Sequence, residues 1–131
     1  MNVELAVAAL GCLVLAAGHA AVGLRWVLPS LRKGTLSSTP FGSPAMTLGM
    51  VRFTWYIVTI LLAAFSVLLL TLALDPRIDT RALLLRWFAA FWLAATALAL
   101  WNSRRRLSSI LRLPVPFVFV IIAAMCWRAS L

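Results

Sequence analysis

The sequence predicts an all-α membrane protein in which four transmembrane helices form an antiparallel bundle, as one domain over residues 1–131. Two observations predict this fold class. Of the 131 residues, 64% are hydrophobic and only 11% are charged, whereas a soluble domain carries roughly 25% charged residues. The apolar residues also come in four long segments, separated by short stretches that hold most of the charge. One small core cannot bury so much apolar surface, so most of it is expected to face lipid.

The clearest of these segments runs from residue 53 to residue 74 and contains 22 residues without a charge. A helix of that length is about 33 Å long, enough to cross a hydrocarbon core of ~30 Å. It has no polar stripe of the kind found on a soluble helix. Arg52 precedes it and Asp75 follows it, so both ends of the span are marked.

Three further spans are predicted at residues 3–24, 82–101 and 113–127. The first contains a row of small residues spaced by four: Ala8, Cys12, Ala16 and Ala20. Such rows let helices approach closely in lipid. The last span is short, about 22 Å as a helix, and needs local bilayer thinning or an extension of the helix toward residue 108. Residues 29–49 are rich in Ser, Thr, Gly and Pro, and are expected to form a loop.

The distribution of positive charge predicts the orientation. The net charge is +9, and most basic residues lie in two loops, residues 25–52 and 102–112. They are Arg25, Arg32, Lys33 and Arg52 in the first loop, and Arg104, Arg105, Arg106 and Arg112 in the second. The positive-inside rule places both loops in the cytoplasm and both termini outside. Eleven of the twelve basic residues are Arg, which indicates a GC-rich bacterial genome, and we therefore expect the protein in a bacterial inner membrane.

The same clusters indicate the partners. Basic residues beside membrane spans contact anionic lipid headgroups, and those placed to do so are Arg25, Arg52, Arg104, Arg105, Arg106 and Arg112. Nucleic acid is not expected as a partner, because the positive charges form short clusters beside apolar segments. Either a larger membrane protein or a second copy of the chain is the expected protein partner.

Catalysis needs titratable side chains held together, and the sequence has three carboxylates and one histidine, all near predicted interfaces. It contains no catalytic motif and no metal-binding spacing, so we expect no enzyme activity, no metal and no cofactor. Cys12 and Cys126 fall at different depths in their spans, which predicts two packing residues rather than a disulfide.

Three polar residues are candidates for a site. His19 precedes Arg25 by six residues and Tyr56 follows Arg52 by four, so both lie at similar depth on antiparallel helices. An unpaired polar group is costly in lipid, which predicts a hydrogen bond between His19 and Tyr56. A haem or metal ligand, a proton relay and a ligand contact are the alternatives. Arg86, one turn inside the third span, is expected to extend to the outer interface, or else to line a pathway.

The residues around His19 resemble a group of small bacterial four-helix membrane proteins of uncharacterised function. The first helix of that group ends in His-x3-Gly-x-Arg, matched by His19, Gly23 and Arg25. Its second helix opens with Arg-x2-Trp-His, matched by Arg52 and Trp55, with a tyrosine in place of the final His. The resemblance covers roughly the first half of the chain. It implies the fold and no activity, and the tyrosine argues against a bis-histidine site.

Three functions remain open from the sequence. The first is an accessory or scaffold subunit that packs against a larger membrane protein, which the small-residue row and Phe41 in the inner loop favour. The second is a small homo-oligomeric transporter or channel. Small multidrug-resistance exporters have four spans but need a carboxylate within the first helix, and Glu4 lies at its outer end. The third is a lipid or quinone binder that uses Arg104–Arg106.

Overall fold

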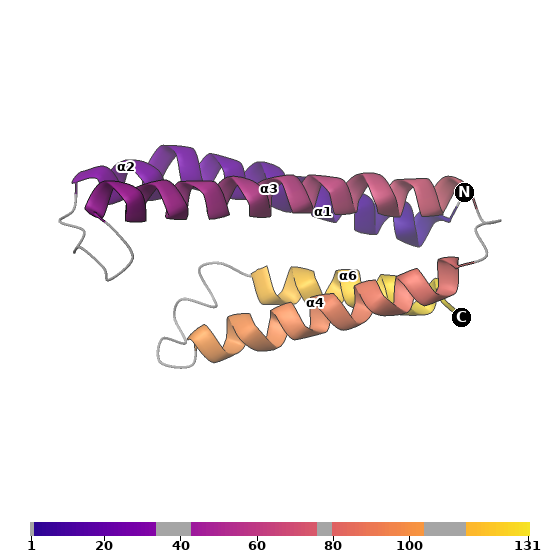
Figure 1. Cartoon of the computed structure of the whole chain (residues 1–131). Helices are drawn as coiled ribbons and strands as arrows, with labels where there is room; N and C mark the ends of the chain where they lie inside the picture. Colours follow the sequence, from indigo (N-terminus) through magenta and orange to yellow (C-terminus); the bar gives the residue numbers. More distant parts are fainter. Residues whose placement is uncertain (1, 34–42, 76–79, 104–114) are drawn as a thin grey trace. The chain divides into compact units, whose positions relative to one another are not determined.

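The structure is a computed structural model that describes residues 2–33, 43–75, 80–103 and 115–131. Every regular element in these residues is helical (Figure 1). The elements are α1 (Val3–Val22), the π-helical turn η1 (Gly23–Val27), α2 (Leu28–Lys33), α3 (Pro44–Leu74), α4 (Arg81–Ser103) and α6 (Val115–Arg128). Three helical stretches are long and apolar enough to cross a membrane: Val3–Leu31, Pro44–Leu74 and Arg81–Trp101. The all-helical class is confirmed, and α6 is a shorter apolar helix.

Two helices extend into the loop that the sequence predicted at residues 29–49. Helix continues through η1 and α2 to Lys33, and α3 begins at Pro44, so the loop prediction is wrong at both of its ends. Residues 34–42, with Phe41, lie outside the described residues. The misread signal at the second end is Ser43-Pro44. The Ser43 hydroxyl accepts from the Met46 N–H, as an N-cap residue does, and proline is favoured at the first helical position that follows.

The π-helical turn explains why Pro29 does not end the first helix. The Leu28 N–H donates to the Gly23 carbonyl, five residues back, instead of four. In a regular α-helix the ring of Pro29 would clash with the carbonyl of residue 25, and its missing N–H would leave a gap in the ladder. A widened turn just before the proline accommodates both effects, so the helix continues into α2.

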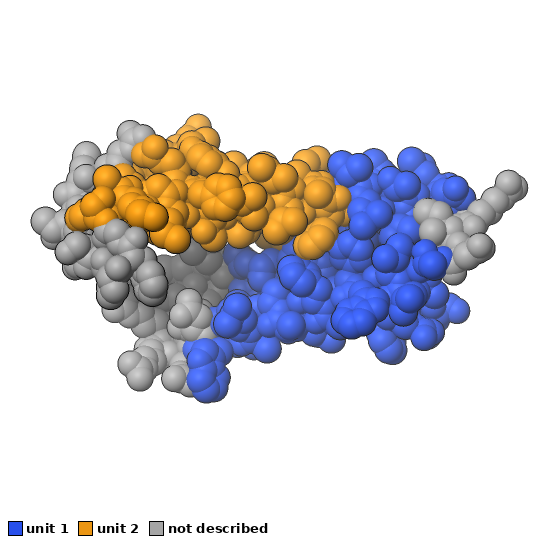
Figure 2. Space-filling view, in the orientation of Figure 1, with its two compact units in different colours: residues 1–11, 66–131 blue, residues 12–65 orange. Residues whose placement is uncertain are grey.

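The chain divides into two compact units, which Figure 2 shows in different colours. Unit 1 comprises Met1–Gly11 and Ser66–Leu131, and unit 2 comprises Cys12–Phe65. In unit 1, α4 packs against α6, and the rings of Trp92 and Phe119 lie 4.9 Å apart between their centroids. Other large side chains that are almost fully buried in unit 1 include Leu5, Leu69, Leu72, Leu85 and Ile122.

The small-residue row of α1 is used within the chain. Ala8, Cys12 and Ala16 are all buried, and Ala20 is half-buried. Cys12 and Cys126 are both buried thiols, as expected for packing residues. This row was one reason to expect a protein partner. The chain itself already buries most of it.

Candidate functional site

A polar cluster in unit 2 joins α1 to α3, and consists of His19, Trp55 and Thr59. Trp55 and Thr59 are four residues apart in α3 and therefore share one face of the helix. His19 Nδ1 lies 2.9 Å from Thr59 Oγ1. The imidazole ring also stacks on the Trp55 indole, with the ring centroids 4.2 Å apart and the planes inclined by 14°.

Gly23 lets the Trp55 indole approach the backbone of the first helix. The indole Nε1–H donates to the His19 carbonyl at 2.9 Å. A Cβ atom on Gly23 would overlap Nε1 and would lie 2.6 Å from Cδ1 of the same ring. No side chain fits in that space, so this glycine is required for the close approach. Trp55 thus contacts both His19 and Gly23, and all three residues belong to the sequence pattern noted above.

The hydrogen bonds of Thr59 are linked to the tautomer of His19. A threonine hydroxyl carries one hydrogen, and Thr59 donates it to the Trp55 carbonyl at 3.0 Å, a bond common for threonine in helices. In this arrangement the hydroxyl oxygen accepts from His19 Nδ1, which carries a proton; with the proton on Nε2, Thr59 would donate to Nδ1 instead. In a neutral imidazole of this tautomer, Nε2 holds the lone pair. With the proton on Nδ1, the cluster offers Nε2 as an acceptor atom for hydrogen bonding or ligation.

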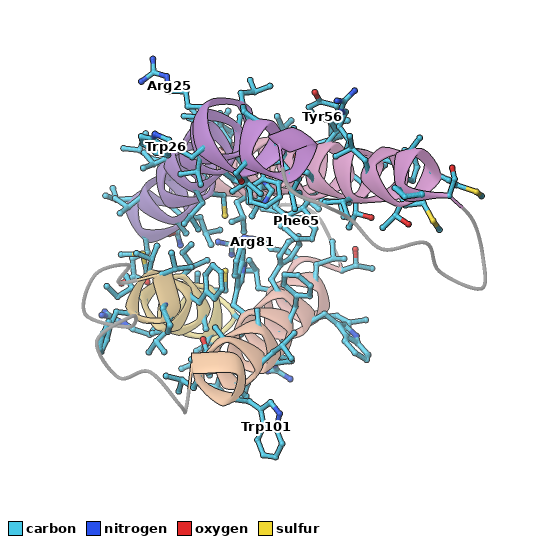
Figure 3. The ribbon with its side chains drawn as sticks, turned by 90° about the vertical axis from the view of Figure 1, so that its left-hand side faces the viewer. Arg25, Trp26, Tyr56, Phe65, Arg81 and Trp101 are labelled. Carbon is cyan, nitrogen blue, oxygen red and sulfur yellow. The ribbon has the colours of Figure 1, made fainter. Side chains whose placement is uncertain are left out.

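Tyr56 is not the hydrogen-bonding partner of His19. The structure gives that role to Thr59, while the Tyr56 side chain is 44% exposed and projects outward from α3 (Figure 3). The reason is the helical period. Tyr56 follows Trp55 by one residue, which turns its side chain by about 100° around the helix axis, whereas Thr59 returns to the face of Trp55.

The arginines that the sequence singled out are spread over the chain. Arg25 is exposed and Arg52 half-buried in unit 2, and Figure 3 shows Arg25 projecting outward. Arg86 is exposed on α4 in unit 1. The remaining four candidates, Arg104, Arg105, Arg106 and Arg112, lie outside the described residues.

In unit 1, polar side chains bind the backbone at helix ends and between helices. The buried Ser66 hydroxyl donates to the Ala9 carbonyl at 2.7 Å. Asn2 caps α1 by accepting from the Leu5 N–H at 3.1 Å. Arg81 Nε donates to the Leu72 carbonyl at 3.3 Å, which satisfies a carbonyl near the C-terminal end of α3.

An ion pair adds to these contacts in unit 1. Arg128 Nη2 lies 2.9 Å from Glu4 Oε1 and links the last residue of α6 to the first turn of α1. Among the described residues, no group of three or more His, Cys, Asp or Glu could hold a metal ion. The polar groups described in both units mainly join or cap helices.

No protein-family model, no curated protein and no solved structure matches the chain. Its function is therefore inferred from its own residues and their contacts.

Proposed function

We propose that the chain is a small integral membrane subunit that packs against a larger membrane protein and performs no catalysis of its own. The observation that carries this proposal is how little of the spans the chain buries. In the most apolar 18-residue windows of the three long helices, only 28%, 22% and 28% is buried inside the chain. Trp26, Phe53 and Leu98 are each more than half exposed. So much apolar surface needs lipid or protein to cover it.

An open apolar groove in unit 1 supports the proposal. It lies on α4 and α6 and is lined by Ala95, Leu98, Ala99, Trp101 and Phe119. Trp101 projects outward from α4 (Figure 3). Aromatic side chains at a concave, apolar surface are frequent in protein interfaces, so this groove is where we expect the larger subunit to contact unit 1.

The pattern of helix contacts supports an antiparallel arrangement. In unit 2, His19 contacts Thr59 and Gly23 contacts Trp55. In unit 1, the Asn2 N–H donates to the Ala73 carbonyl, and Ser66 binds Ala9. Within each unit, residue numbers rise along the first helix while they fall along α3, as in antiparallel neighbours.

The proposal includes the orientation that the basic residues favour. Both termini lie outside a bacterial inner membrane, and the loops at residues 25–52 and 102–112 lie in the cytoplasm. A C-terminal fusion to alkaline phosphatase, which is active only outside the cytoplasm, is then active. The same fusion made after residue 33 is inactive. The opposite pattern of activity would show that both termini lie in the cytoplasm.

The alternative is a small homo-oligomeric transporter or channel. Proton-coupled exporters of this size need a carboxylate that exchanges protons within the membrane. Glu4 is paired with Arg128 at the ends of their helices, which favours a role in joining helices. The third reading, a lipid or quinone binder at Arg104–Arg106, concerns residues outside the described part of the chain.

Native mass spectrometry of the protein, extracted gently from its own membranes, tests the proposal. A stoichiometric second polypeptide is the expected result, and a Leu98→Lys change in the groove should release it. A matched Leu13→Lys change on the exposed side of α1 should not. A homodimer or ring without another polypeptide would contradict the accessory role and would favour the transporter.

A further inference from the structure

Arg86 differs from the other arginines that the structure describes in unit 1. Arg81 donates to the Leu72 carbonyl, and Arg128 is paired with Glu4. In the part of the chain that the structure describes, Arg86 has no hydrogen bond and no ion pair. Its side chain is exposed on a helix that is apolar enough to cross a membrane. A charge in that position is stabilised by an anion, and the described residues supply none to Arg86.

The position of Arg86 places this anion near the beginning of α4. Arg86 is five residues after Arg81, the first residue of the helix, which corresponds to about 7.5 Å along the axis. The Cα–Cβ bonds of a helix tilt toward its N-terminus. An extended arginine side chain therefore leans back toward the membrane edge, the level at which phospholipid phosphates lie.

The neighbours of Arg86 on the same face suit a lipid. Leu83 and Trp87 are 58% and 69% exposed, and Ala90 is exposed one turn further along. With Arg86 they form a surface of four residues at helical spacing, which we call the Arg86 face. An indole is favoured at the headgroup level because its ring is apolar and its N–H polar, and the alkyl and ring surfaces fit acyl chains.

We propose that the Arg86 face binds a phospholipid with an anionic headgroup, whose phosphate pairs with the Arg86 guanidinium and whose acyl chain lies along Trp87 and Ala90. The proposal rests on the membrane insertion proposed above, but not on the accessory role. Charge decides the headgroup. A guanidinium without an acidic partner among the described residues favours a lipid of net negative charge, such as phosphatidylglycerol, over a zwitterionic one.

Lipid titration of the delipidated full chain in detergent, followed by native mass spectrometry, tests the proposal. We expect one phosphatidylglycerol to bind more tightly than phosphatidylcholine. Arg86→Gln should weaken that binding about tenfold, and Arg86→Lys should retain most of it. Arg128→Gln is the matched control, since Arg128 already has an anion within the chain, and should change the affinity less than about twofold.

Three results would overturn the proposal. Equal phosphatidylglycerol binding by Arg86→Gln and the wild type would show that Arg86 is not the site. Displacement of the lipid by millimolar inorganic phosphate would identify a site for free phosphate. Loss of a co-purified polypeptide from Arg86→Gln, with lipid binding intact, would assign the Arg86 face to a protein partner. Circular dichroism of each variant confirms that the helices remain folded. If the protein forms only homo-oligomers and still binds the lipid, the accessory role is refuted and the lipid proposal stands.

Discussion

The contact of α1 with α3 in unit 2 and the contact of α4 with α6 in unit 1 are held together by different means. In unit 2, His19 and Trp55 join α1 to α3 through hydrogen bonds and a ring stack, next to a glycine that allows close approach. In unit 1, α4 and α6 meet through large apolar side chains, with Trp92 only 1% exposed. Lipid supplies no hydrophobic drive between helices. Two other interactions therefore hold the helices together: short hydrogen bonds between α1 and α3, and close apolar packing between α4 and α6.

Trp55 and Trp92 illustrate the difference between these two helix contacts. The Trp55 indole is positioned by its N–H bond to the His19 carbonyl and by Gly23 beneath the ring. Trp92 is positioned by the aromatic rings around it, Phe91 at 5.3 Å and Phe119 at 4.9 Å between centroids. Substitutions between α4 and α6 should therefore lower the free energy of unfolding by leaving a cavity. Substitutions between α1 and α3 should lower it through steric overlap or through the loss of a hydrogen bond.

The largest effect is expected from Trp92→Ala in unit 1. The change removes a buried indole and leaves a cavity between α4 and α6, which should lower the free energy of unfolding by about 3 kcal/mol. Unfolding in mixed micelles with increasing sodium dodecyl sulfate, followed by circular dichroism, measures it. Trp87→Ala is the matched control, because Trp87 is 69% exposed. Equal losses for both variants would contradict the packing account of unit 1.

In unit 2, Gly23→Ala should be the most disruptive small change. The new methyl group displaces the Trp55 indole and breaks its bond to His19, at a cost of about 2 kcal/mol. Gly18→Ala, where nothing lies within 4 Å of the added Cβ, should be neutral or slightly stabilising.

A double-mutant cycle tests the cause of this effect. In a Trp55→Ala background the Gly23→Ala change should cost little, because the ring that clashes with it is absent. The same cost in both backgrounds would show that Gly23 acts through the helix backbone and not through Trp55.

Thr59→Val should cost about 1 kcal/mol, because it keeps the volume of Thr59 and removes the hydrogen bond to His19. The chain has a single histidine, so ¹⁵N-histidine labelling reports His19 alone. In the wild type, the ¹⁵N shifts of the neutral ring should show the proton on Nδ1, and Thr59→Val should shift the ring toward the other tautomer. A wild-type proton on Nε2 would mean that Thr59 donates to the imidazole instead.

The smallest effect is expected from Ser66→Ala in unit 1. The hydroxyl of Ser66 is buried and donates to the Ala9 carbonyl. A hydrogen bond of this kind between membrane helices contributes about 0.6 kcal/mol on average. Thr71→Ala is the control, since the exposed Thr71 binds a carbonyl of its own helix. A loss above that of Thr59→Val would show that this polar bond contributes more to unit 1 than the His19–Thr59 bond contributes to unit 2.

The sequence by itself located three of the four predicted spans, at 3–24, 53–74 and 82–101, inside helices that are long and apolar enough to cross a membrane, while the fourth corresponds to a shorter apolar helix. Uncharged apolar runs leave few alternatives to a helix, because lipid cannot satisfy backbone groups. The small-residue row of Ala8, Cys12 and Ala16 likewise predicted a contact face, and these residues are buried. Helix ends were harder to predict, because proline at residues 29 and 44 suggested turns. A π-turn and an N-cap let both prolines lie inside helices.

Only the tertiary structure decided the partner of His19. The sequence placed His19 and Tyr56 at similar depth, since depth follows from the distance along the chain to the flanking arginines. Which residue of that turn of α3 meets His19 depends on the rotation of the helix about its own axis. Packing sets that rotation: the indole of Trp55 lies on Gly23, which turns Thr59 toward His19 and Tyr56 outward. The sequence shows that residue 23 is a glycine, but it does not show that the Trp55 ring occupies the space beside it.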